Sequence, residues 1–173
     1  MKSKVLVTGS QGFIGSYICK ELLENDYEVI GVDNYSKYGY LVRAHDKHEK
    51  FTLVKTDASK ESFQNDLEKY DFDYIIAGAA MIGGISYFHK YAYDLLSTNE
   101  RIISNTFDLA ISKFKKNKLK KILVLSSSMV YENTGKWPTS ESDLEQSPPP
   151  SSTYGFQKLA CEYFAKGAFE QYE

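Results

Sequence analysis

The chain has 173 residues, of which 42% are hydrophobic and 25% are charged, and its net charge at pH 7 is −2. That length and composition predict one soluble globular domain over residues 1–173 and give no reason to expect nucleic acid or an anionic membrane as a partner. The apolar run near Met1 is too short for a signal peptide or a membrane span, and Cys19 and Cys161 fit buried free thiols, so a cytoplasmic protein is expected.

The first predicted strand and helix enclose a glycine-rich turn. The run 4–8 predicts a buried strand, the spacing over 12–24 predicts a helix, and Gly9, Gly12 and Gly15 lie where the two meet. Glycine has no Cβ, so it allows the strand to turn sharply, the backbone to approach a ligand, and the helix to pack against the strand. The start of such a helix offers N–H groups and a partial positive charge to a pyrophosphate, although a glycine triplet alone also fits an ordinary turn.

Short apolar strands and helical patterns alternate along the rest of the chain. The interval 131–153 holds all four prolines and indicates a long irregular loop, which is usually functional or disordered. Alternating strands and helices, with strands that are apolar throughout, predict an α/β fold with a doubly wound parallel sheet covered on both faces. The further strands are predicted over 28–32, 51–56, 74–77 and 122–125, and the further helices over 59–70 with Ser59 as cap, over 91–116, and over 154–172 with Leu159, Tyr163, Phe164 and Phe169 buried.

Polar residues at the ends of the predicted strands indicate a ligand site, since ligands of such sheets bind at the carboxyl ends of the strands. Asp33 ends the second strand, where its carboxylate can accept both hydroxyls of an adenosine ribose and repel a 2′-phosphate. NAD is therefore favoured over NADP, although Lys37 and Arg43 lie near in sequence and Asp33 also fits a plain turn. Asp57 ends the third strand and fits either an acceptor for the adenine amino group or a turn residue.

Tyr154 and Lys158 lie four residues apart at the start of the last predicted helix, so they share one face. An ammonium near a phenol favours the phenolate, which suits such a pair to general acid and base chemistry near neutral pH. Ser127, at the end of the fifth strand, offers a hydroxyl that can hydrogen-bond a reacting oxygen. Each feature alone also fits an ordinary role, which is a solvated helical pair for the first and a turn serine for the second.

Two histidines, His45 and His48, have a spacing compatible with a metal, but no second cluster of ligands accompanies them. A solvated loop is the better interpretation, and no metal is expected. The chain also lacks the Gly-x-x-x-x-Gly-Lys-[Ser/Thr] motif of phosphate-binding loops.

Taken together and in this order, the motifs resemble the extended short-chain dehydrogenase/reductase family, in particular its NAD-dependent nucleotide-sugar epimerases and dehydratases. The resemblance covers the whole chain and rests on residues 8–15, Asp33-Asn34, Asp57, Ala79-Ala80, the Ser-Ser-Ser-Met-Val-Tyr run 126–131 and Tyr154-Gly-Phe-Gln-Lys158. It implies that NAD is the cofactor and that Ser127, Tyr154 and Lys158 form the catalytic set. The residues that it assigns to the cofactor are Gly9, Gly12, Phe13, Ile14, Gly15, Asp33, Asn34, Asp57, Ala58, Ala79, Ala80, Asn99, Tyr154 and Lys158.

The same resemblance implies an epimerase that oxidises a UDP- or GDP-sugar transiently to a keto-sugar and returns the hydride to it. Ser128 occupies a position that is acidic in many sugar dehydratases, which argues against dehydration. Residues 79–84 are similar to those of GDP-mannose 3,5-epimerase and GDP-fucose synthase, whereas Glu132 stands where many members have glycine. A nucleotide-sugar dehydratase or a keto-sugar reductase of the same family remains an alternative.

Members of this family are about twice as long, and their second half completes the sheet and builds the sugar-nucleotide pocket. We therefore expect a truncated member whose Rossmann-type sheet lacks the C-terminal strands and the substrate domain. A non-catalytic NAD-binding or dimerising module is the alternative. Family members commonly pair two helices across a two-fold axis in a four-helix bundle, which implies a homodimer through helices 91–116 and 154–172.

Overall fold

The computed structural model describes residues 3–172, and the chain divides into two compact units. The first contains the residues up to Ala80 together with Arg101–Leu125, and the second contains Met81–Glu100 and the residues from Ser126 onward. Helix α4 (Ala92–Lys115) contributes to both units, because the boundary falls between Glu100 and Arg101. One domain over the whole length stays a prediction.

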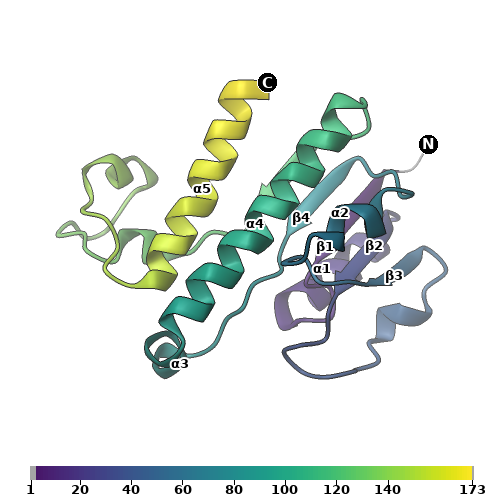
Figure 1. Cartoon of the computed structure of the whole chain (residues 1–173), viewed down its shortest axis with the longest axis horizontal. Coiled ribbons are helices and arrows are strands. Elements are labelled where there is room, and N and C mark those ends of the chain that lie inside the picture. The colour runs from purple at the N-terminus through teal and green to yellow at the C-terminus, as the bar shows by residue number, and fades with distance from the viewer. Residues whose placement is uncertain (1–2, 173) are drawn as a thin grey trace. The chain divides into compact units, whose positions relative to one another are not determined.

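The first unit is built on a five-stranded parallel sheet, which confirms the α/β fold predicted from the alternating pattern (Figure 1). Its strands are β1 (Lys4–Thr8), β2 (Glu28–Asp33), β3 (Phe51–Lys55), β4 (Tyr74–Ala77) and β5 (Lys121–Val124), in the order β3-β2-β1-β4-β5. Thr8 at the end of β1 lies opposite Val32 of β2 and Ala77 of β4. The carboxyl ends of the three central strands therefore meet at one edge of the sheet.

Helices cover both faces of this sheet, each over its own apolar core. α1 (Phe13–Glu24) packs on one face, where Cys19 and Leu23 join Val5 and Val7 of β1 in a buried cluster. Because neighbouring residues of a strand point to opposite faces, a strand that is covered on both sides must be apolar throughout. The opposite face carries α2 (Ser62–Leu67) and the second part of α4, and its buried cluster includes Leu6, Ile30, Phe63, Leu67, Ile75 and Leu109.

The order of the strands reverses between β1 and β4. The chain runs outward from β1 through β2 to β3 and then returns to place β4 on the other side of β1. In open parallel sheets, ligands bind outside the carboxyl ends of the strands at such a reversal. The glycine turn after β1 and the small residues after β4 lie at this point of the sheet.

The second unit is mainly helical. It contains α3 (Ile85–Lys90), the first part of α4, and α5 (Thr153–Tyr172), which is yellow in Figure 1. The predicted irregular interval 131–153 contains a short 3₁₀ helix, η3 (Glu141–Gln146), and follows another, η2 (Ser128–Tyr131). Asp143 fixes the start of η3 by accepting hydrogen bonds from the N–H and the hydroxyl of Ser140, each at 2.8 Å.

Three local expectations differ from the structure. The helix predicted over 59–70 begins only at Ser62, because the Ser59 hydroxyl donates a hydrogen bond of 2.7 Å to Asp57 and does not cap a helix. The sequence pattern does not predict α3, since six residues are too few for a helical period to stand out. Tyr163 and Phe169, which were expected in the core, are 66% and 70% exposed because they lie on the solvated face of α5.

Cys19 and Cys161 are both buried and free, as predicted. Among residues 3–172, no helix combines the length and the apolar character that a membrane crossing needs.

Candidate functional site

The turn after β1 brings three glycines into contacts that a side chain would block. Gly9 has a φ of +74°, in the left-handed region that favours glycine, and a Cβ there would lie 3.0 Å from the backbone of Ala79. A Cβ on Gly15 would lie 2.0 Å from the carbonyl oxygen of Gly9, so α1 can approach β1 this closely only with glycine at that position. Gly12 donates its N–H to the same carbonyl at 3.0 Å, which closes the turn.

Helix α1 begins directly after this turn without a capping side chain. Gly12 is the N-cap, and no side chain forms a capping hydrogen bond there. The N–H groups of Phe13, Ile14 and Gly15 precede the first intrahelical bond, which runs from Ser16 back to Gly12. The side chains of Phe13 and Ile14 are exposed. This helix start suits an anionic ligand such as a pyrophosphate.

The hydroxyl of Thr8 ties the ends of β1 and β4 together. Thr8 is fully buried, and its Oγ1 accepts the N–H groups of Gly78 and Ala79, each at 3.1 Å. The backbone that follows β4 is therefore fixed beside Gly9, where only small residues leave space. Ala79 and Ala80 are both partly exposed at this edge, where a ligand can reach them.

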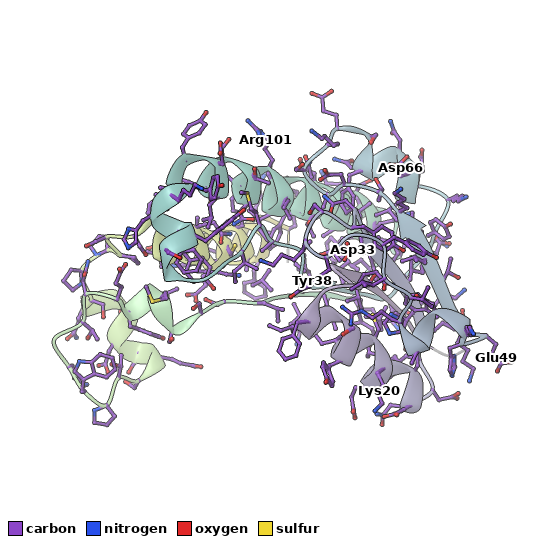
Figure 2. All side chains as sticks on the ribbon, turned by 90° about the horizontal axis from the view of Figure 1, so that it is seen from below. Lys20, Asp33, Tyr38, Glu49, Asp66 and Arg101 are labelled. Atoms are coloured by element: carbon purple, nitrogen blue, oxygen red, sulfur yellow. The ribbon has the colours of Figure 1, made fainter. Side chains whose placement is uncertain are left out.

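Asp33 ends β2 beside the glycine turn and accepts two backbone hydrogen bonds. Its Oδ2 accepts the N–H of Gln11 at 3.0 Å, and its Oδ1 accepts the N–H of Tyr35 at 2.7 Å. The side chain is only partly buried, and each carboxylate oxygen can accept a further hydrogen bond. A small pocket beside it is also lined by Lys37 and by Tyr38, which Figure 2 labels together with Asp33. Asp33 thus anchors the turn, and its carboxylate can still accept hydrogen bonds from hydroxyl groups.

Asp57 forms a turn with Ser59. Its Oδ1 accepts the N–H and the hydroxyl of Ser59 at 2.9 and 2.7 Å. Burial raises the pKa of Asp57, but hydrogen bonds from Ser59 and from Asn34 outweigh burial and hold the pKa below its usual value. Ala58 is buried in the core, and its carbonyl accepts the Asn105 amide at 2.9 Å. Asp57 therefore stabilises the turn that follows β3. Contacts of Asn34, Asp57 and Ala58 with an adenosine stay a prediction.

In the second unit, Asn99 uses both ends of its side-chain amide on one residue. Its Oδ1 accepts the N–H of Met81 at 2.6 Å, and its Nδ2 donates to the carbonyl of Met81 at 2.9 Å. Asn99 is 2% exposed, so the pair is shielded from water. Asn99 thus fixes the backbone that follows Ala80, and a direct contact with a cofactor stays a prediction.

Tyr154 and Lys158 lie on one face of α5, and both are buried. Each is 8% exposed, which excludes the solvated pair that the spacing left open. Phe88 of α3 stacks on the ring of Tyr154, with the ring centres 4.5 Å apart and the planes at 8°. The Nζ of Lys158 lies 6.0 Å from the centre of the same ring, and burial lowers the pKa of Lys158. The second unit therefore holds a phenol and an amine near each other where little water reaches them.

Ser127 and Gly155 lie where η2 packs against the start of α5. Ser127 is the N-cap of η2, and its Oγ accepts the N–H of Met129 at 3.2 Å, which leaves the hydroxyl proton to donate elsewhere. A Cβ on Gly155 would lie 2.7 Å from the carbonyl oxygen of Met129 and 2.6 Å from Pro150. Glycine directly after Tyr154 therefore permits α5 to pack this closely on η2.

His45 corrects the sequence interpretation of a solvated loop. It lies in η1 (Ala44–Lys47), is only 7% exposed, and packs edge-on against Phe51 with the ring centres 4.6 Å apart. His48 is exposed, as expected. Over the part of the chain that the structure describes, no group of three or more His, Cys, Asp or Glu side chains could hold a metal ion.

Protonation of His45 should make the fold less stable in mild acid. Burial lowers the pKa of His45, an effect that Asp46 opposes and Arg43 reinforces. As the pH falls below about 6.5, the unfolded chain gains a proton that the folded chain resists, so the free energy of unfolding falls until the pH passes the folded-state pKa. Urea unfolding at about pH 7.5 and about pH 5.5 should show this loss, and His45→Gln should reduce it. An equal loss in the variant would assign the acid sensitivity to other groups.

Sequence reasoning missed the roles of three residues near these sites. The position of Arg43 in the sequence suggests only a role toward a 2′-phosphate, whereas its guanidinium donates to the carbonyl of Gln11, with Nη2 at 2.6 Å. Phe88 lies in the short helix that the pattern does not predict. Gly155 carried a signal that was available, because a glycine inside a predicted helix often marks close packing.

The first unit fits a dinucleotide. A Cβ would fill the cradle at Gly9 and Gly15, so glycine keeps the backbone open to a pyrophosphate at the start of α1. Asp33 offers carboxylate oxygens beside the pocket that follows β2. The donor and acceptor groups present thus match the diphosphate and the ribose of NAD.

Comparison with known proteins agrees with this fit. The model of the NAD dependent epimerase/dehydratase family matches residues 5–173. An uncharacterized protein of Methanocaldococcus jannaschii, MJ1055, is 32% identical over 95% of this chain and 52% of its own length. A UDP-N-acetylglucosamine 4-epimerase from Methanobrevibacter ruminantium M1 is 32% identical, with a TM-score of 0.76 over 99% of this chain and 52% of that chain. The UDP-glucose 4-epimerase from Bifidobacterium longum, solved with NAD⁺ and UDP, is 26% identical, with a TM-score of 0.78 over 98% of this chain and 50% of that chain.

The chain spans about half the length of the curated relatives it matches. The match begins in β1 and includes the glycine turn, Asp33, and the Tyr154 and Lys158 pair. NAD is the cofactor of this family, as the glycine turn and Asp33 predict. With its Rossmann-type sheet and these sequence matches, the chain belongs to the NAD-dependent epimerase/dehydratase family.

Proposed function

We propose that the chain is the NAD-binding and catalytic part of a nucleotide-sugar epimerase that acts on a UDP- or GDP-sugar. The observation that carries the proposal is the burial of Tyr154 and Lys158 together on one face of α5. Lysine is rarely buried, because removing its charge from water costs free energy. Buried ionisable groups with shifted pKa values concentrate at catalytic sites. Similarity to UDP-sugar 4-epimerases supports a nucleotide-sugar substrate.

In the proposed reaction, Tyr154 takes the proton of a sugar hydroxyl and later returns it. Lys158, as a cation, stabilises the phenolate on which this proton transfer depends. Ser127 donates its hydroxyl proton in a hydrogen bond to the reacting oxygen and so holds it in place. Phe88 covers one face of the phenol and keeps water from it. NAD, when bound, supplies the hydride acceptor and donor.

Replacing Asp33 with alanine should weaken NAD binding by roughly 10- to 100-fold, which corresponds to about 1.4–2.7 kcal/mol. The variant loses the proposed acceptor for the ribose and the hydrogen bond to Gln11. NADP should lose less affinity than NAD, because removal of the carboxylate also removes the repulsion of a 2′-phosphate. Calorimetric titration with both cofactors tests this, with Glu49→Ala, an exposed carboxylate of the same unit (Figure 2), as control. Equal losses for NAD and NADP would leave Asp33 only its role as an anchor of the turn.

A turnover assay tests the epimerase proposal against its alternatives. The protein to assay is the longest translation product that contains this chain, because the relatives are about twice its length. UDP-glucose, UDP-N-acetylglucosamine and GDP-mannose are each incubated with it and NAD, and the epimers are detected by NMR. A parallel incubation supplies NADH and a 4-keto nucleotide sugar, because a keto-sugar reductase needs both. A reductase would oxidise the NADH and so lower the absorbance of the reduced nicotinamide, whereas an epimerase regenerates its NAD. A protein that binds NAD and converts none of these sugars would instead support a binding or dimerising module.

We further propose a cytoplasmic homodimer that pairs through helices 91–116 and 154–172. The two buried free thiols support a reducing compartment. Large exposed apolar side chains are common at interfaces between proteins. If the helices pair as proposed, light scattering should show a single mass, that of a dimer. A mass that rises continuously with concentration would contradict specific pairing. The exposed aromatic residues of these helices that support pairing are Tyr93, Phe114, Phe156, Tyr163 and Phe169.

A further inference from the structure

Gln11, which lies between Gly9 and Gly12, is held at three of its polar groups. Its N–H donates to Asp33 at 3.0 Å, and its side-chain Nε2 donates to Oδ1 of Asp46 at 2.9 Å. Its carbonyl accepts two hydrogen bonds from the Arg43 guanidinium, from Nε at 3.2 Å and from Nη2 at 2.6 Å. Gln11 is 3% exposed, so water competes little for these bonds.

Arg43 and Asp46 hold each other as well as Gln11. The Arg43 N–H donates to Oδ2 of Asp46 at 2.8 Å, and the Asp46 N–H donates to the Arg43 carbonyl at 3.1 Å. One carboxylate therefore binds the Gln11 amide with one oxygen and the Arg43 backbone with the other. Between the two residues, His45 is buried against Phe51, which fixes the segment to β3. These contacts form a rigid support for the turn from residues more than thirty positions further along the chain.

The hydrogen bonds from Arg43 and Asp46 to Gln11 restrict the conformations open to the glycine turn. The peptide that joins Gln11 to Gly12 is planar, so holding the Gln11 carbonyl also sets the direction of the Gly12 N–H. That N–H closes the turn on Gly9, whose left-handed conformation is one of many that glycine can adopt. A turn rich in glycine loses much conformational freedom when it binds a ligand, and ordering it beforehand lowers that cost.

We propose that Arg43 and Asp46 are positioning residues that hold the glycine turn ready for the pyrophosphate of NAD. In this role Arg43 acts through Gln11 and does not contact the cofactor. The inference depends on the NAD dependence of the family and not on the sugar chemistry, so it stands or fails separately from the epimerase proposal.

Arg43→Met tests it, because methionine removes both donors to the Gln11 carbonyl and keeps an apolar stem. Affinity of the whole chain for NAD and for ADP-ribose, measured by calorimetry, should fall roughly 10-fold. Affinity for adenosine, measured by ligand-observed NMR, should change less than about 2-fold, because adenosine has no pyrophosphate. Arg43→Lys keeps one charged donor and should recover part of the lost affinity. Arg101→Met alters an exposed arginine of α4 (Figure 2) and should leave all three affinities unchanged.

Asp46→Asn gives a second test that does not depend on whether Arg43→Met folds. Gln11 and Arg43 donate to different oxygens of Asp46, and asparagine replaces one of these acceptors with an NH₂ donor, so one of the two hydrogen bonds is lost. Affinity for NAD and for ADP-ribose should again fall, while affinity for adenosine should not. Circular dichroism establishes which variants are folded. A folded variant that binds NAD within about 2-fold of the parent would overturn the proposal. So would an equal loss for adenosine and ADP-ribose, since that result assigns both residues to the general stability of the unit.

Discussion

Tyr154→Phe should lower turnover by about 10²- to 10⁴-fold and leave NAD affinity unchanged. The substitution removes one oxygen atom, which the proposed mechanism uses to take and return a proton. The phenyl ring remains, so its stacking on Phe88 and its packing beside Lys158 are kept. Turnover of the sugar nucleotide that is found active, and calorimetric titration with NAD, measure the two effects on the same preparation.

Tyr163→Phe is the matched control for this experiment. Tyr163 lies on the same helix and is 66% exposed, and phenylalanine keeps the ring that supports the proposed pairing of helices. Loss of the Tyr163 hydroxyl alone should therefore change neither turnover nor NAD affinity. If Tyr154→Phe retained most of the activity, the proton would have to move through another group. If it lost NAD affinity as well, the hydroxyl would serve binding and not proton transfer.

Gly15→Ala should destabilise the first unit by about 3 kcal/mol or more and weaken NAD binding at least about 10-fold. The new Cβ would lie 2.0 Å from the Gly9 carbonyl oxygen and 3.1 Å from the Cα of Ser10. Both neighbours are backbone atoms of the turn itself, so no side-chain rotation can relieve the clash. α1 must shift away from β1, which moves its first N–H groups from the position that suits a pyrophosphate. Urea unfolding and calorimetric titration with NAD measure the two losses.

Gly167→Ala makes the same chemical change at another helical glycine. Gly167 lies in α5, where a Cβ would meet no atom within 4 Å. The variant should therefore gain about 0.5–1 kcal/mol, because alanine restricts the unfolded chain and favours the helix. If both variants lost similar stability, the cause would be a general intolerance of the chain and not the contact between α1 and β1.

Much of the first unit could be predicted, because its strongest features are local in sequence. The strand, turn and helix around Gly9, Gly12 and Gly15 each follow from neighbouring residues, and the continuous apolar strands indicate a sheet covered on both faces. The carboxyl ends of the strands could be placed at one edge of the sheet, because parallel strands run in the same direction. These inferences need only periodicity and the conformational freedom of glycine.

Contacts between distant residues could not be predicted in this way. The guanidinium of Arg43 reaches the Gln11 carbonyl across thirty-two positions, and no period connects the two residues. The burial of His45 depends on Phe51, and an isolated histidine gives no sign of it. For Tyr163 and Phe169, the spacing of apolar residues predicts the helix correctly but does not say whether anything covers these two side chains.

Two residues near the candidate catalytic groups, Glu132 and Phe88, show the same limit. The Oε2 of Glu132 accepts the N–H of Ser152 at 2.9 Å, just before α5 begins. Phe88 supplies the stacking partner of Tyr154 from a helix too short for its pattern to be recognised. Both act through shape and pairing in three dimensions, which a motif of fixed spacing does not contain.

The side chain of Asn99 takes the place of a peptide group for Met81. A neighbouring strand would offer one N–H and one carbonyl to the Met81 backbone, and a primary amide offers the same donor and acceptor from a helix. Aspartate would keep the acceptor and lose the donor, and leucine would lose both. Helix α4, through one asparagine, therefore sets the path of the backbone after Ala80, where none of the strands within residues 3–172 pairs with it.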